Sequence, residues 1–194
     1  MKRLFILVFL CCFGVVLHAQ QHLTFKSIPI QGSLSEFVGK LKAQGFVVEN
    51  KYDTGISMKG SFVGFKDCSI IIMATAQTQT VWKVAAFLPD QSSWSSTCSR
   101  YEEFKEKYTN KYGKPSEEFE FFMSPYELGD GYELQAIALD KGAWSSYWVS
   151  DLGTIVVEIN ASNNSSGWVR LAYEDAEGVK IMKSEKNAII DDDI

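Results

Sequence analysis

Histidine, the side chain that most often serves as a general base, is almost missing from this sequence. His18 and His22 are its only two histidines. We expect His18 to be removed with a signal peptide and His22 to lie at a mobile mature N-terminus. Ser-His-Asp and Cys-His hydrolysis need a histidine held inside the fold, and the usual zinc sites need histidine or four thiolates. The sequence therefore predicts neither kind of site.

The familiar catalytic and ligand-binding motifs are also missing. The sequence contains no G-x-S-x-G, no Ser-x-x-Lys, no P-loop, no G-x-G-x-x-G and no EF-hand loop. Asp53-Thr54-Gly55 matches one loop of an aspartic protease, but that chemistry needs two such loops facing each other. Because only one copy occurs, we interpret it as a turn between two strands. We predict no catalytic residue, no cofactor, no metal site and a protein that is not an enzyme.

Carboxylates remain as a route to acid–base chemistry. A glycosidase needs two of them roughly 5–10 Å apart across a sugar-sized cleft. Their spacing in this sequence selects no pair, so a carbohydrate-binding or carbohydrate-processing function stays open as an alternative. The candidates are Glu117, Glu118, Glu120, Glu127, Asp130, Glu133, Asp151 and Glu158.

Aromatic residues offer a different function, recognition through a surface. Trp144, Tyr147 and Trp148 cluster in one segment, and Tyr126 is close by in the sequence. In a strand, Trp144 and Trp148 share one face while Tyr147 lies on the other. If one face packs against a helix, the other presents rings that stack on sugars or anchor a protein partner. The alternative is that these rings fill a core.

Cysteine usage depends on what is removed from the N-terminus. Four cysteines occur, of which Cys11 and Cys12 lie in the predicted signal peptide. The remaining pair, Cys68 and Cys98, could form one disulfide in an oxidising compartment. Two free thiols are the alternative, since sequence alone cannot bring their Cα atoms within bridging distance.

The N-terminus predicts export. Lys2 and Arg3 precede an apolar run from Leu4 to Leu17, and Ala19 follows as a small residue at the exit. A short basic segment, an apolar run of this length and a small residue are typical of a secretory signal, and the run is short for a membrane span. We predict a signal peptide over 1–19 and a periplasmic or extracellular protein, from a bacterium.

The charge of the remaining chain limits the classes of partner that it can bind. The whole sequence has a formal net charge of −5, and loss of Lys2 and Arg3 makes the excess of acid larger. An acidic chain without a Lys/Arg cluster is poorly suited to nucleic acid or anionic lipid. No second apolar run of membrane-spanning length follows the signal peptide. We expect a protein or glycan partner in the cell envelope.

Two helices stand out from their caps and apolar spacing. Ser33 to Glu36 is a capping box, followed by an apolar stripe and by Gly45 as a terminating residue. The second helix covers about 93–112 and ends before Gly113. Strands are expected elsewhere from alternation and from the turn residues between them. They cover 24–30, 46–50, 56–63, 69–75, 80–88, 118–123, 134–139, 145–149, 154–159 and 168–173.

The two halves of the chain follow one order, a helix and then about four strands. Leu34, Phe37 and Leu41 correspond at constant spacing to Tyr101, Phe104 and Tyr108. We therefore predict a two-layer α+β fold made of two tandem repeats, each one helix packed on a four-stranded antiparallel sheet. The repeats cover 20–90 and 91–183, and an acidic C-terminal tail covers 184–194.

This order of elements resembles the β-lactamase-inhibitory-protein-like fold and small envelope proteins of that layout. The resemblance covers most of the chain after the signal peptide but consists of element order alone. It implies a binding or inhibitory role, with the reservation that a fold does not determine a function.

Overall fold

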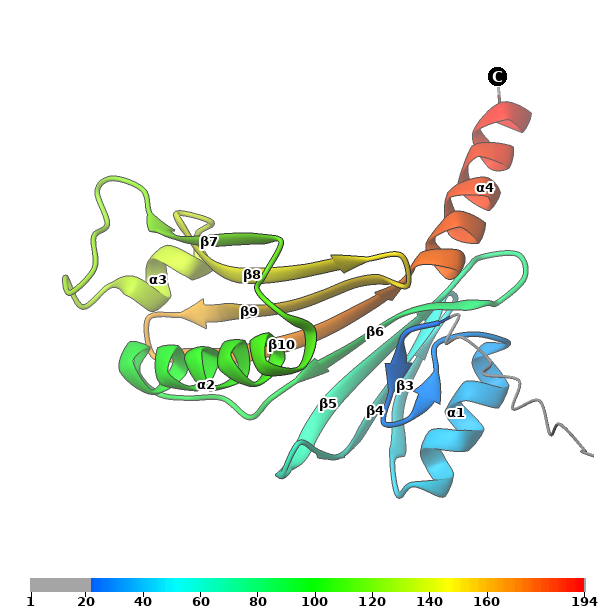
Figure 1. Ribbon diagram of the computed structural model, residues 1–194, viewed down its shortest axis with the longest axis horizontal. Coiled ribbons are helices and arrows are strands. Elements are labelled where there is room, and N and C mark those ends of the chain that lie inside the picture. Colours follow the sequence, from blue (N-terminus) through cyan, green and yellow to red (C-terminus); the bar gives the residue numbers. More distant parts are fainter. Residues whose placement is uncertain (1–21, 194) are drawn as a thin grey trace, which may run out of the picture.

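The computed structural model describes residues 22–193, so the predicted signal peptide lies outside the described part of the chain. The predicted α+β class is confirmed: four helices accompany one large antiparallel sheet and one small sheet (Figure 1). The helices are α1 (Leu34–Ala43), α2 (Trp94–Tyr112), α3 (Glu133–Ala138) and α4 (Ala176–Asp193). No helix within this range combines the length and apolar character needed to cross a membrane.

Helices α1 and α2 begin and end at residues suited to capping. The side chain of Ser33 accepts a hydrogen bond from the Glu36 amide, and Ser93 does the same for Ser96. Each bond satisfies an amide that the first turn of a helix leaves free. Gly45 and Gly113 follow the helix ends with φ of 89° and 88°, a conformation that glycine adopts without steric cost.

In the described part of the chain, ten strands form two sheets. The small sheet is a hairpin of β1 (Thr24–Phe25) and β2 (Ile28–Pro29). The large sheet has the order β3-β4-β5-β6-β10-β9-β8-β7. Its strands are β3 (Val47–Tyr52), β4 (Gly55–Phe62), β5 (Phe65–Ala74), β6 (Val81–Phe87), β7 (Glu117–Phe122), β8 (Gly142–Ser150), β9 (Gly153–Asn163) and β10 (Ser166–Asp175).

A single eight-stranded sheet takes the place of the two four-stranded sheets that we expected. The last strand of each half, β6 and β10, pair antiparallel at the centre, with Ala85 opposite Ala172. This pairing satisfies the backbone groups that two separate sheets would leave exposed at their edges.

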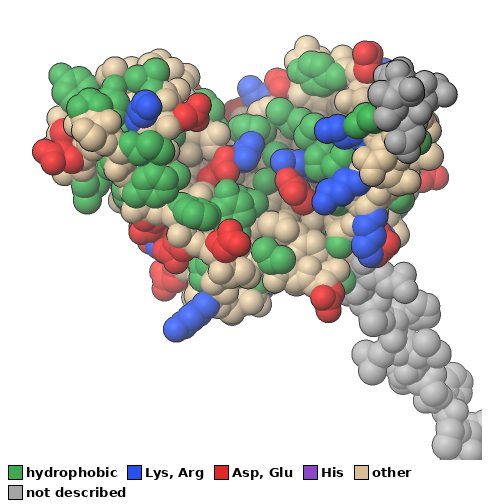
Figure 2. All heavy atoms as spheres, turned by 90° about the horizontal axis from the view of Figure 1, so that it is seen from above, with side chains coloured by type: hydrophobic (Ala, Val, Ile, Leu, Met, Phe, Trp, Pro, Cys, Tyr) green, Lys and Arg blue, Asp and Glu red, His purple; other side chains and the backbone are tan. Residues whose placement is uncertain are grey.

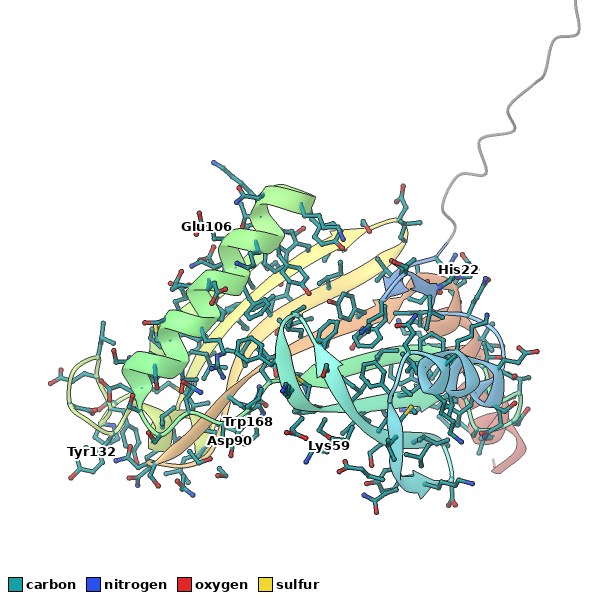
Figure 3. All side chains as sticks on the ribbon, turned by 90° about the horizontal axis from the view of Figure 1, so that it is seen from below. His22, Lys59, Asp90, Glu106, Tyr132 and Trp168 are labelled. Atoms are coloured by element: carbon teal, nitrogen blue, oxygen red, sulfur yellow. The ribbon has the colours of Figure 1, made fainter. Side chains whose placement is uncertain are left out.

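Helices α1 and α2 cover the same face of this sheet, as the view from below shows (Figure 3). Their apolar stripes are buried against it, including Phe37 and Leu41 of α1 and Tyr101 and Phe104 of α2. The main core therefore lies between the helices and one face of the sheet. On the other face, α4 rises at the end near β6 (Figure 1), and no helix of residues 22–193 covers the centre of the sheet there.

Two predicted elements were wrong. The segment 134–139, predicted as a strand, lies in and directly after helix α3, in which Leu134 and Ile137 are buried at helical spacing. The spacing of apolar residues in this segment is compatible with a strand and with a helix, and the helix forms because it packs against the sheet. The predicted strand at 24–30 is the β1–β2 hairpin, because Lys26 and Ser27 adopt positive φ of 48° and 63° and reverse the chain.

Most of the predicted acidic tail over 184–194 is helical, since α4 continues to Asp193. The carboxylate of Glu185 anchors this helix to the turn between β5 and β6. It accepts hydrogen bonds from the amides of Gln77 (2.7 Å) and Thr78 (3.1 Å) and from the Thr78 hydroxyl (2.7 Å). A residue of the predicted tail is thus a buried attachment point.

This attachment predicts a pH-dependent loosening of α4. Burial alone would raise the pKa of Glu185, but the hydrogen bonds from Thr78 and Gln77 outweigh it and lower the pKa to about 2. A lowered pKa stabilises the docked helix above the ordinary value of 4.5, and this stabilisation is lost as the pH falls towards 2. Protection factors of the Gln77 and Thr78 amides, measured by hydrogen exchange, should fall across that range.

The matched control is Glu185→Gln, which removes the titrating group. Protection of Gln77 and Thr78 should then show no change over the same pH range, while amides in the centre of β9 behave alike in both proteins. Identical pH profiles for the two proteins would contradict the attachment.

Candidate functional site

Two of the four aromatic residues predicted as a binding surface belong to the core. Trp144 and Trp148 lie on the face of β8 that α2 covers, and both are buried. Trp144 packs edge-on against Trp94 of α2, with ring centroids 4.8 Å apart. The indole N–H of Trp148 donates to the Gly113 carbonyl at 2.8 Å. As a binding surface this half of the prediction was wrong, because α2 covers their side of the strand.

Tyr147 lies on the opposite face, as strand alternation predicts. Its ring makes a T-shaped contact with Phe119 of β7 at 6.0 Å, and its register partner on β9 is Val156. Tyr126 lies apart from both groups, in the loop between β7 and α3, and is half-buried. The structure therefore does not unite the four predicted residues in one site.

The face that carries Tyr147, here called the open face, is built from side chains of β6, β8, β9 and β10. Figure 2, the view from above, shows hydrophobic side chains interspersed with charges of both signs on this side. Strand register arranges the side chains in three rows: Phe87, Arg170, Glu158 and Ser145; Ala85, Ala172, Val156 and Tyr147; and Lys83, Glu174 and Thr154.

The middle row of the open face is apolar. Ala85, Ala172 and Val156 form a small cluster separate from the main core, with Phe87 and Tyr147 packed against it. Because the central residues are small and the rings lie at the border, this row forms a shallow apolar surface. Contact with a partner's apolar side chains would remove that surface from water, and burial of apolar surface is the main favourable term in association.

Ion pairs flank the apolar row. Lys83 contacts Glu174 at 2.6 Å, and Arg170 contacts Glu158 at 2.6 Å. All four side chains are partly buried, so their charges neutralise one another without a large net field. Burying such pairs under a partner costs less desolvation free energy than burying unpaired charges, because each charge already has a partner of opposite sign.

Two hydrogen-bond donors on the open face lack acceptors. Within the described part of the chain, the indole nitrogen of Trp168 and the Nε of Arg170 are buried and have no hydrogen-bond partner. Both residues belong to β10 and, two positions apart, they share a face. A buried donor without an acceptor costs about 1–3 kcal/mol, so neighbouring instances call for an explanation. An acceptor supplied by a ligand would satisfy them.

A hollow of about 300 Å³ adjoins the open face at the end near α3. Glu158, Asn160, Asp140 and Tyr147 are among the residues that line it. The Asn160 side-chain amide donates to Glu158 at 2.7 Å, and Glu158 also holds Arg170. Their polar groups are therefore oriented before any ligand arrives.

Other predicted carboxylates have structural roles. Glu118 and Glu120 of β7 bind the ammonium group of Lys105 at 2.7 and 2.5 Å, and Glu102 joins them from α2. Burial alone would lower the pKa of Lys105, but the hydrogen bonds to these three carboxylates outweigh it and raise the pKa above its ordinary value. Through Lys105, Glu118 and Glu120 thus join α2 to the edge strand β7. Glu133 accepts a hydrogen bond from the Gly129 amide at 2.9 Å and orders the loop before α3.

The two cysteines are free, so the disulfide that the sequence allowed is not formed in this structure. Cys68 is buried in β5 beside the carbonyls of Phe62 and Phe65. Cys98 lies on α2 near Glu102 and Glu120. Burial raises the pKa of both thiols, which makes them poor nucleophiles.

His22, which we expected at a mobile N-terminus, is fixed in place. Its Nδ1 lies 3.0 Å from the carboxylate of Asp175. That carboxylate is fully buried and also accepts the amides of Leu23 (2.9 Å) and Gly178 (3.1 Å). Asp175 therefore joins the start of the folded chain to β10 and to the first turn of α4.

The most informative residues for function, Trp168 and Arg170, were not among the predicted site residues. Their alternation in the sequence indicated a shared strand face, but their burial without acceptors depends on neighbouring strands. Comparisons of this chain with protein-family models, with curated proteins and with solved structures give no match.

Proposed function

We propose that this chain is a non-enzymatic, exported binding protein of the cell envelope, which recognises a protein partner through the open face. The observation that carries the proposal is the pair of buried donors on Trp168 and Arg170 that lack acceptors. A partner whose backbone carbonyls or carboxylates reach this face would remove their desolvation cost. Export is inferred from the signal-peptide pattern over 1–19.

The composition of the open face favours a protein over a small ligand. Its rows combine rings, one arginine and small apolar residues, while its other charges are already paired. Aromatic residues and arginine are enriched where protein interfaces are buried, and unpaired charges are depleted there. The face extends across four strands, and exposed apolar side chains continue it beyond β8, on β7 and the following loop: Phe119, Phe121, Met123 and Leu128.

The test is affinity capture of the mature chain's partner from an envelope extract, followed by affinity measurement with the purified partner. Trp168→Phe keeps an aromatic ring but removes the indole donor, and we expect about a tenfold loss of affinity, equivalent to about 1.4 kcal/mol. Tyr147→Ala should have an effect of at least that size, because it removes a ring at the border of the apolar row.

The matched control is Tyr112→Ala, which removes an exposed ring from α2 on the other side of the sheet. It should leave the affinity unchanged. The proposal fails if the open-face variants bind as the native chain does while Tyr112→Ala abolishes binding. Protection of β10 and β9 from hydrogen exchange in the complex would support it independently.

A glycan ligand is the second candidate function, favoured by the hollow beside α3. This hollow brings two carboxylates, Asp140 and Glu158, together with the Asn160 amide and the Tyr147 ring. Such a set can donate and accept hydrogen bonds to sugar hydroxyls while the ring stacks on a pyranose. Retention of the native chain on immobilised glycans, abolished by Asn160→Ala, would favour this candidate over a protein partner.

We further infer that the chain consists of two duplicated modules, as its resemblance to the β-lactamase-inhibitory-protein-like layout implies. The order β3-β4-β5-β6-β10-β9-β8-β7 supports this, since strands in equivalent positions of the two halves lie symmetrically about the centre. The stripes matched in sequence are also buried in both helices, with Leu34, Phe37 and Leu41 in α1 and Tyr101, Phe104 and Tyr108 in α2. The open face then joins the last strand of the first module, β6, to three strands of the second, β8, β9 and β10.

A further inference from the structure

A groove lies on the helix side of the molecule, away from the open face. It consists of two adjoining hollows of about 540 and 290 Å³, which share Thr24, Lys111 and Tyr112 as lining residues. Four elements far apart in the sequence line it: the end of α2, the β1–β2 hairpin, the turn between β4 and β5 at the larger hollow, and the β8–β9 hairpin at the smaller one. In Figure 3 these elements surround the region between α2 and the hairpin that begins near His22.

The charged side chains that line this lysine groove are all basic. Lys26, Lys107 and Lys111 line the larger hollow, and Lys111 and Lys114 line the smaller one. No aspartate or glutamate is among the lining residues of either hollow. In a chain with a net charge of −5, a concave surface of one positive sign attracts anions, because its charges act together.

Part of this charge has a structural explanation. A lysine in the last turn of a helix complements the negative end of its dipole, which accounts for Lys111. Lys107 pairs with Glu103 on the same helix at 3.0 Å. Lys26 needs a different reason, since it comes from the hairpin turn. Its ammonium group lies 3.2 Å from the Ser61 carbonyl and 5.0 Å from the centre of the Phe46 ring. The hairpin thus adds a cation that the helix does not require.

A buried pair of tyrosines lies among the lining residues of the larger hollow. The hydroxyl groups of Tyr108 and Tyr173 are hydrogen-bonded to each other, and both residues are buried. Burial raises the pKa of Tyr108 to about 12 and that of Tyr173 above its ordinary value. Both phenols therefore carry their protons at neutral pH.

Two phenols with two protons share only one hydrogen bond between them. One hydroxyl donates to the other, so the second proton is not used within the pair. Within the described residues, no other hydrogen-bond acceptor contacts either hydroxyl. Because both tyrosines line the larger hollow, the unused donor is available to an acceptor bound there. The apolar and aromatic residues beside it are Phe62, Val63, Phe104 and Tyr112.

We propose that the lysine groove binds a small organic anion, in which a carboxylate or phosphate group is carried on a body with an apolar face. The anionic oxygens lie among Lys26, Lys107 and Lys111 and accept the free hydroxyl proton of the Tyr108–Tyr173 pair. The body of the ligand packs on Phe62, Phe104 and Tyr112. This inference does not rest on the open face, because the groove lies on the opposite side of the sheet.

Calorimetric titration of the mature chain tests the proposal with three probes of similar size. D-glucuronate carries a carboxylate, glycerol 3-phosphate carries a phosphate, and D-glucose carries no charge. We expect at least one of the two anions to bind and glucose not to bind. Binding should weaken several-fold between low and high salt, because exposed lysines are screened. Binding of glucuronate alone identifies a carboxylate site, and binding of glycerol 3-phosphate alone identifies a phosphate site.

Variants locate the binding. The double variant Lys26→Gln and Lys111→Gln should reduce anion affinity at least tenfold, whereas Lys40→Gln, an exposed lysine of α1 that lines neither hollow, should not. The double variant Tyr108→Phe and Tyr173→Phe should also weaken binding. It should remain folded, because replacing both partners of a buried hydrogen bond by apolar groups of the same shape is nearly neutral.

Three results would overturn the proposal. One is equal binding of glucose and glucuronate, which would remove the role of charge. Another is anion binding that survives both double variants, which would place the anion elsewhere. The last is no binding of either anion at millimolar concentration by the folded native chain.

Discussion

Replacing Trp148 with alanine should lower the free energy of unfolding by about 4 kcal/mol, the range seen for large aromatic residues in protein cores. The ring is only 5% exposed and contacts the ring of Tyr108 at 5.6 Å. Its indole N–H also holds the carbonyl of Gly113 at the end of α2. The substitution opens a cavity under α2 and leaves that carbonyl without its donor. Urea unfolding followed by circular dichroism measures the loss.

Tyr147→Ala is the matched control for this prediction, because it changes the adjacent residue of the same strand. Tyr147 is half-buried on the open face, and we expect a loss of about 1 kcal/mol or less. Equal losses for the two variants would contradict the assignment of the two faces of β8. The pair also separates folding from recognition, since only Tyr147→Ala is expected to impair partner binding while the chain remains folded.

Replacing Asp175 with alanine should lower the free energy of unfolding by about 3 kcal/mol. The amides of Leu23 and Gly178 would lose their acceptor, and each stranded buried donor costs about 1–3 kcal/mol. His22 would lose its partner as well. Because Asp175 joins three segments of the chain, we expect early hydrogen exchange at the β1–β2 hairpin and at the first turn of α4.

Two comparisons make this prediction specific. His22→Ala should cost less than Asp175→Ala, because the carboxylate still accepts both amides. Asp151→Ala changes an exposed aspartate in the turn between β8 and β9 and should alter stability by no more than about 0.5 kcal/mol. An Asp175→Ala protein as stable as Asp151→Ala would show that the buried carboxylate does not hold these segments together.

Features that depend on short stretches of chain were predicted well. Ser33 and Ser93 cap their helices as their sequences indicate, and Gly45 follows the end of α1. Asp53 and Thr54 form the predicted turn between β3 and β4. Strand alternation also divided Tyr147 from its two neighbouring tryptophans. These features are local, because a cap, a turn or an alternation is determined by interactions among a few consecutive residues.

Segments whose local sequence does not determine their structure were predicted less well. The residues of α3 fit both the helical and the strand period, and the buried position of Leu134 at the sheet end decides between them. The acidic end of the chain was predicted only as a tail, since nothing near Glu185 in sequence indicates the amides of Gln77 and Thr78 that hold it. Tertiary contacts outweigh local preference in both segments.

The sequence by itself therefore determined the chemistry available to this protein: almost no histidine, two cysteines beyond the predicted signal peptide, many carboxylates and a set of rings on alternating strand faces. Only the tertiary structure decided where that chemistry is exposed. Pairing of β6 with β10 created the open face, and packing of α2 placed Trp144 and Trp148 in the core. Folding also brought Lys26 to Lys111 and Tyr108 to Tyr173. The physical reason is that burial and electrostatic context depend on neighbours distant in sequence, which no local pattern contains.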